Sequence, residues 1–178
     1  MAKPKRESPM DLYDQIENTR YLGEEFLTWL WYASEQNEGV FEFGDGLEME
    51  VLFDNQLTLE ANLAEAERSK LSGGAPSFSR EAKEALKSGK RVTQAKLRLR
   101  REEREWVFTV TARTLGISGM KMPAVLSRED DDQFYERMDL IDEADTSLRA
   151  LYLLFLQRRL GDEWGVELEK MMEWAVSE

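Results

Sequence analysis

Apolar residues recur at helical spacing in the first part of the chain. A stripe that repeats every three or four positions predicts an α-helix from residue 8 to about residue 37. Its members are Leu22, Phe26, Trp29, Leu30 and Ala33. Leu27 and Trp31 lie on nearly the opposite side, so the helix has two apolar faces. Either its own domain covers both faces, or Leu27 and Trp31 are interface residues for a partner subunit or a further domain.

The pattern then changes to an alternation with a period of two, which is typical of β-strands. Residues 40–43 predict a short strand. Residues 47–53 and 57–61 alternate on either side of Asp54-Asn55-Gln56 and predict a first hairpin with its turn at those three residues. Residues 63–71 fit either a helix or a strand.

A second hairpin is predicted at residues 95–100 and 106–112, with its turn at residues 101–104. Its apolar side chains are expected to face inward; they are Ala95, Leu97, Leu99, Trp106, Phe108, Val110 and Ala112. Lys96, Arg98 and Arg100 alternate with them and are expected to face outward. Residues 115–122 predict a further strand.

Helical periodicity returns in the last third of the chain. It predicts a long helix from residue 127 to Gly161 and a short amphipathic helix at residues 164–176, while residues 79–88 predict another short helix closed by Gly89. We therefore expect one α+β domain over residues 1–178, with residues 1–8 flexible. In it, an antiparallel sheet of two main hairpins packs with the N-terminal aromatic helix and the long C-terminal helix. From the helices, the expected core includes Phe26, Trp29, Leu30, Tyr152 and Phe155.

The composition removes several kinds of chemistry. The 178 residues include no cysteine and no histidine, which excludes disulfides, thiolate zinc sites and the commonest general base. No apolar run reaches the roughly 20 residues that span a bilayer, and the N-terminus lacks the apolar core of a secretory signal, so we expect a cytoplasmic protein without membrane contact. No phosphate-binding loop or nucleophile motif is present. We predict no enzyme activity, no cofactor and no metal, and Asp130-Asp131-Asp132 are expected to complement a helix dipole.

Charge is distributed unevenly along the chain. The net charge is −12, but residues 80–121 contain twelve Lys and Arg against five Glu, which gives that segment +7 and the remainder −19. Such an asymmetry is a clue to binding partners.

Three stretches carry a resemblance to a known family: RYLGEEFLTWLWYASE, SGKRVTQAKLRLRREEREWVFTVTA and QFYERMDLIDEADTSLRALYLLFLQRRLGDEW. Over about residues 20–165 the chain resembles the C-terminal half of the RdgC family of recombination-associated proteins. The resemblance implies an α+β fold, ring-shaped dimers, binding to duplex DNA without sequence preference, and restraint of recombinases. Because the N-terminal half of that family has no counterpart here, ring closure is not implied.

Two functions follow from these patterns. The first is sequence-independent binding of double-stranded DNA, with a role in modulating recombination and a location at the nucleoid. Its candidate residues are Arg91, Lys96, Arg98, Arg100, Arg101 and Arg104. The second is an acidic protein-interaction or regulatory module that does not bind DNA, in which case those cations are the wet face of a sheet. A homodimer or a separately encoded partner is compatible with either function.

Overall fold

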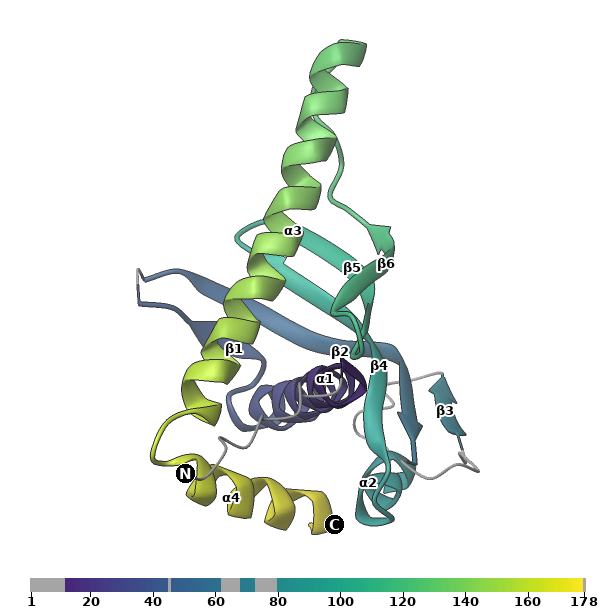
Figure 1. The fold of residues 1–178 in the computed structure, drawn as a ribbon. Helices are drawn as coiled ribbons and strands as arrows, with labels where there is room; N and C mark the ends of the chain where they lie inside the picture. The colour runs from purple at the N-terminus through teal and green to yellow at the C-terminus, as the bar shows by residue number, and fades with distance from the viewer. Residues whose placement is uncertain (1–11, 45, 62–67, 73–79, 178) are drawn as a thin grey trace, which may run out of the picture.

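An antiparallel sheet with helices on one face forms the domain, as the α+β prediction required (Figure 1). This computed structural model describes residues 12–44, 46–61, 68–72 and 80–177; within these ranges it describes the side chains from Leu22 onward, except at position 68. The helices are α1 (Leu12–Gln36), α2 (Arg80–Lys87), α3 (Asp130–Arg159) and α4 (Trp164–Val176). The strands are β1 (Val40–Glu42), β2 (Glu48–Glu60), β3 (Arg68–Ser72), β4 (Arg91–Arg101), β5 (Arg104–Thr111) and β6 (Gly116–Lys121). Residues 1–8, which are predicted to be flexible, and the predicted start of the first helix at residue 8 lie outside the described residues.

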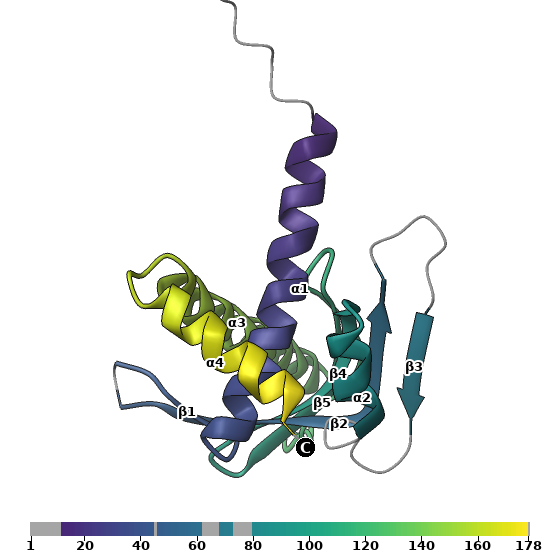
Figure 2. The same ribbon diagram turned by 90° about the horizontal axis from the view of Figure 1, so that it is seen from below.

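The strands follow the order β1-β2-β4-β5-β6. The remaining strand, β3, pairs with the end of β2 on the edge opposite β4. The second predicted hairpin is confirmed as β4–β5, with Leu97 opposite Phe108 and Leu99 opposite Trp106, all four of them buried. Between the two strands the chain turns at Glu102 and Glu103. In Figure 2 the sheet is seen from below, with α1, α3 and α4 lying over one of its faces.

The turn predicted at Asp54-Asn55-Gln56 is wrong. The single strand β2 runs through these residues, and its pairing with β4 shifts register between Phe53 and Leu57. Because β4 is long enough to pair with both halves of β2, the polar residues form an irregularity within the ladder and no reversal of the chain. Hairpin partners do flank β2, since β1 pairs with its beginning and β3 with its end.

Both apolar faces of α1 are covered by the chain itself. Trp31 packs between Phe53 of β2 and Trp174 of α4, with ring centroids at 6.3 and 4.9 Å. Leu27 and Trp31 are both 0% exposed. Their assignment as interface residues is therefore wrong, because no surface of either side chain is left for a partner, and the alternative of a helix sandwiched within its own domain describes the structure.

The opposite face of α1 packs against α3. Phe26 meets Tyr152 edge-on at 5.2 Å, and Phe155 lies 5.7 Å from Phe26 and 5.6 Å from Trp29. These inward predictions are confirmed, although Tyr152 is half-buried. Edge-on and tilted aromatic pairs of this kind contribute about 0.5–1.5 kcal/mol beyond the area they bury.

A single carboxylate serves the two indoles where α1 meets α4. Glu35 accepts one hydrogen bond from Trp31 Nε1 (2.8 Å) and another from Trp174 Nε1 (2.6 Å). Lys83 of α2 completes the corner, with its Nζ 3.7 Å from Glu35 and 5.1 Å from the centre of the Trp174 ring. The arrangement satisfies the polar atoms of two large aromatic side chains and ties three helices together.

Gly23 allows α1 to approach the end of β5 closely. A Cβ atom built at Gly23 would lie 1.8 Å from the carbonyl oxygen of Ala112, a distance at which the backbone must move. The absence of a side chain at this helical position therefore sets the distance between α1 and the sheet.

We predict that Gly23→Ala destabilises the protein by more than about 2 kcal/mol in urea unfolding, because the clash outweighs the gain of about 1 kcal/mol that alanine brings to a helix. Gly165→Ala is the matched control, since a Cβ there meets nothing within 4 Å. This control variant should be as stable as the wild type or slightly more so. Equal stability of Gly23→Ala and the wild type would show that the close approach does not constrain the fold.

Candidate interaction surfaces

Three of the predicted DNA-binding residues lie together on the outer face of the sheet. Lys96, Arg98 and Arg100 occupy alternate positions of β4, and the residues between them, Leu97 and Leu99, are buried on the helix side. Alternation along a strand places successive cations of this stripe about 7 Å apart. The predicted register of β4 is therefore confirmed.

Carboxylates from the neighbouring strands pair with each of these cations. Lys96 Nζ lies 3.6 Å from Asp54 and 3.0 Å from the Asn55 side-chain oxygen. Arg98 contacts Asp54 at 3.4 Å and Glu105 at 2.8 Å. Arg100 contacts Glu105 at 2.6 Å and Glu50 at 3.1 Å. We call these residues the outer-face network.

The network contains as many carboxylates as cations. Opposite charges that alternate within a few ångströms cancel one another at distances beyond the Debye length, which is about 8 Å at physiological ionic strength. The outer face consequently presents a pattern of neutralised pairs, and a phosphate would have to compete with carboxylates that already hold the cations.

The other three predicted cations lie elsewhere. Arg101 and Arg104, at the turn between β4 and β5, both contact Glu143 of α3, at 3.5 and 2.6 Å. Arg91 lies at the opposite end of β4, is half-buried and also makes an interaction within the fold. The structure therefore does not bring the six residues into one continuous basic surface.

Salt bridges within the outer-face network shift the pKa of Glu105. The hydrogen bond from Arg100 is the largest cause and holds the pKa of the Glu105 carboxyl below its ordinary value, and the charges of Arg98 and Arg100 act in the same direction. The same hydrogen bond raises the pKa of Arg100. Since the Glu105 side chain is 38% exposed, the shift in its pKa reflects the local arrangement of charges and implies little about stability.

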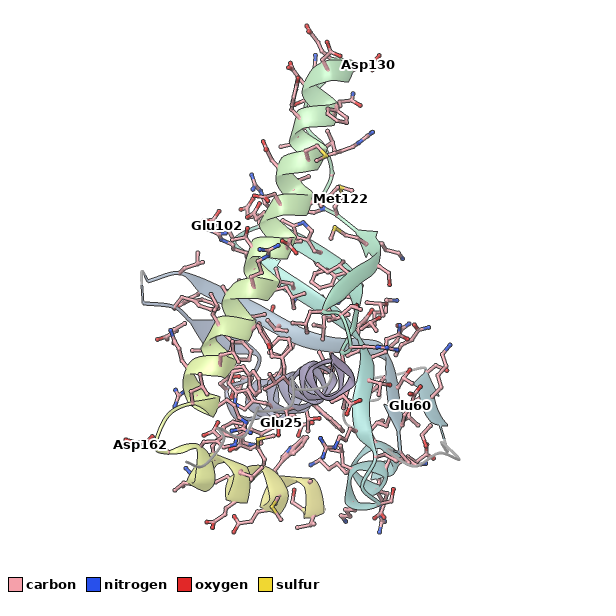
Figure 3. The ribbon with its side chains drawn as sticks, viewed as in Figure 1. Glu25, Glu60, Glu102, Met122, Asp130 and Asp162 are labelled. Carbon is pink, nitrogen blue, oxygen red and sulfur yellow. The ribbon has the colours of Figure 1, made fainter. Side chains whose placement is uncertain are left out.

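A different kind of surface lies between β6 and α3. Figure 3 shows Met122 between the end of β6 and α3, and Asp130 at the far tip of that helix. The open groove there has a volume of about 440 Å³. It is lined by Ile117, Met120, Met122, Met138, Ile141, Asp142 and Asp145. We call it the β6–α3 groove.

Helical spacing did not reveal this groove, because apolar residues repeat at that spacing along the whole of α3, whether they are buried or exposed. Leu148, Leu151 and Phe155 of the stripe are buried, as a core position requires. Phe134, Met138 and Ile141, by contrast, are 59%, 50% and 40% exposed. The signal available in the sequence was the density of acids around them, because the predicted helix carries most of its carboxylates in the same half.

The segment between β6 and α3 is held in place by Glu136. Its two carboxylate oxygens accept hydrogen bonds from the backbone N–H groups of Leu126 and Ser127, both at 2.8 Å. A hydrogen bond from the Ser127 side chain is the largest cause that lowers the pKa of Glu136, and the two backbone bonds act in the same direction. Leu126 itself is 84% exposed, which extends the apolar surface near the tip of α3.

Among the described residues, no three acidic side chains are grouped so that they could hold a metal ion, and this includes Asp130, Asp131 and Asp132. The helices that the structure describes also include none that is both long enough and apolar enough to cross a membrane.

No family model, curated protein or solved structure matches this chain. The resemblance to the RdgC family therefore remains a prediction from the sequence.

We predict that Arg100→Gln raises the pKa of Glu105 toward the ordinary value of 4.5. A carboxyl whose pKa is lowered in the folded state contributes stability above its unfolded pKa, and that contribution is lost as the pH falls through the folded pKa. In the variant, Glu105 should therefore protonate at higher pH, as followed by the NMR shift of its side-chain carboxyl carbon. An unchanged titration would show that Arg100 does not hold Glu105 in solution.

Proposed function

We propose that the chain is a non-catalytic protein-binding module, and that the β6–α3 groove is its contact surface. The observation that carries the proposal is the exposure of Phe134, Met138 and Ile141 on one face of a helix. Met138 and Ile141 line the groove beside the edge strand β6. Large apolar side chains gathered at one place on a surface are typical of protein interaction sites. The pairing of the predicted DNA-binding cations with carboxylates also favours this function over DNA binding.

A photoreactive amino acid at position 138 tests the proposal. We expect it to form an adduct with one protein in extracts of the source cells, whereas the same amino acid at position 172 should not. Met172 is a matched control because it is also exposed, at 63%, but lies on α4. The protein captured should then bind the purified wild-type chain directly.

Direct binding measurements complete this prediction. Met138→Glu should bind the captured protein at least about tenfold more weakly than the wild type, because a charge would enter an apolar contact. Met172→Glu should bind normally. Equal labelling at positions 138 and 172, or full affinity of Met138→Glu, would exclude the groove as the contact surface.

Sequence-independent binding of duplex DNA is the second candidate function, with the role in recombination that the resemblance implies. It is favoured by the alternate placement of Lys96, Arg98 and Arg100 on the sheet face that the helices leave open (Figure 2). Long cationic side chains at this spacing can reach phosphates without reading bases. The cost is displacement of Glu50, Asp54 and Glu105 from the outer-face network.

For this second candidate, replacing the three cations by glutamate should abolish binding in fluorescence anisotropy with two unrelated duplexes at low salt. The variant Glu50→Gln/Asp54→Asn/Glu105→Gln should bind DNA more tightly than the wild type, because it frees the same cations. Arg113→Glu/Arg137→Glu/Lys170→Glu is the matched control, since it makes the same change in net charge elsewhere and should leave any stripe-dependent binding in place. The three contacts should contribute about −2.7 to the slope of log K against log salt concentration that the wild type shows. If neither the wild type nor the Glu50→Gln/Asp54→Asn/Glu105→Gln variant binds either duplex, DNA binding is excluded as a function of this chain.

A further inference from the structure

Building on the proposed function, we infer that the partner of the β6–α3 groove is a basic amphipathic helix about three turns long. On α3, Met138, Ile141 and Asp145 line the groove. Phe134, which is 59% exposed, precedes Met138 by four positions and extends the same face of the helix beyond the groove. These residues are spaced by four, three and four positions, so they form a single line along the helix. At 1.5 Å per residue the line is about 16 Å long, which equals three helical turns.

The geometry of β6 disfavours an added strand as the occupant. Its pairing with β5 shifts register between Val107 and Thr109, opposite Gly119, which has a φ of +60°. The backbone N–H of Gly116 is also already bonded to Thr114 Oγ1 at 3.1 Å. A short, bulged edge of this kind does not present the regular row of donors and acceptors that a further strand requires.

Methionines supply three of the apolar side chains that line the groove. Met120 and Met122 lie on the β6 side, and Met138 on the α3 side. Methionine is unbranched and polarisable, and it adapts to the side chains of an inserted helix, as in other Met-rich grooves that accept amphipathic helices. The lining therefore fits a helix whose apolar face can vary in shape.

Charge determines the polar face of the occupant. Residues 128–145 contain nine carboxylates and two arginines, which gives this part of the chain a net charge of −7. Asp145 is bonded to Arg149 at 2.7 Å. Asp142 lies at the groove without a hydrogen bond or ion pair to any other residue that the structure describes. Lys or Arg residues beside the apolar stripe of the partner would find these carboxylates within reach.

The same charge argues against a second copy of the chain in the groove. Two copies that pair through this surface would bring two sets of like charges together, which costs free energy that apolar contact must first offset. A basic helix gains from the same field. The occupant that the groove favours is therefore a helix of another protein. Self-association would be detected in the experiment below as a dimer.

Three labelled peptides of equal length test this inference with the full chain, by fluorescence anisotropy and analytical ultracentrifugation. The first carries leucines at positions i, i+4, i+7 and i+11 with lysines between them, and should bind. The second has the same leucines with glutamates, and should bind at least about tenfold more weakly. The third has the composition of the first, but its four leucines occupy every second position of one stretch, which favours a strand, and it should also bind more weakly.

Variants of the chain locate the binding. Met138→Glu should lower the affinity for the first peptide at least about tenfold. Because this change adds negative charge, the loss of affinity cannot come from a weaker attraction to the lysines. Met172→Glu adds the same charge on α4 and should bind as the wild type does. Asp142→Asn should weaken binding and reduce its salt dependence.

Equal binding of all three peptides, unchanged affinity of Met138→Glu, or a dimer that excludes the peptide would overturn the inference. If a protein captured at position 138 binds the chain but the first peptide does not, the inference of a helical partner is wrong. The proposed protein-binding function would then still be supported. If no protein is captured and the first peptide does not bind, both the protein-binding function and the helical partner are excluded.

Discussion

Burial of α1 on both sides is the constraint on which the rest of the structure depends. One face of the helix is covered by Phe53 of β2 and Trp174 of α4, and the opposite face is covered by Phe155 of α3. A helix with two apolar faces is stable only when two layers cover it. The distance between α1 and the sheet is set at Gly23, where the backbone of α1 meets Ala112. The C-terminal helices are therefore part of the core, and removing either would expose aromatic surface of α1.

The same arrangement explains why α3 has two halves with different roles. Its second half covers α1 and is buried from Leu140 onward at the core positions. Its first half extends past the sheet in Figure 1, where only β6 and the following segment accompany it. Apolar residues in this half gain no cover from α1, so they remain exposed. The β6–α3 groove is thus a consequence of a helix that is longer than the layer it covers.

Prediction from the sequence succeeded where local periodicity and tertiary packing agree. The β4–β5 register followed from alternation alone, and α4 has the predicted boundaries of residues 164–176. It failed at Asp54-Asn55-Gln56, because turn-forming residues can also occupy a bulge when a long partner strand is available, and strand length is a tertiary property. It also failed for Leu27 and Trp31, because a sequence shows that a helix face is apolar but does not show what covers it.

The candidate site illustrates a second limit of sequence patterns. A count of charge along the chain placed +7 in residues 80–121, yet the partners of these cations come from outside that segment as well as from within it. Asp54 and Glu50 belong to β2, and Glu143 belongs to α3. Pairing across strands and between layers converts a basic segment into a neutral surface. Most acids of residues 128–145, by contrast, have no cationic partner among the residues that the structure describes. The field that a binding partner meets is therefore set by topology, and here topology places residues 128–145, with their net charge of −7, beside the apolar groove.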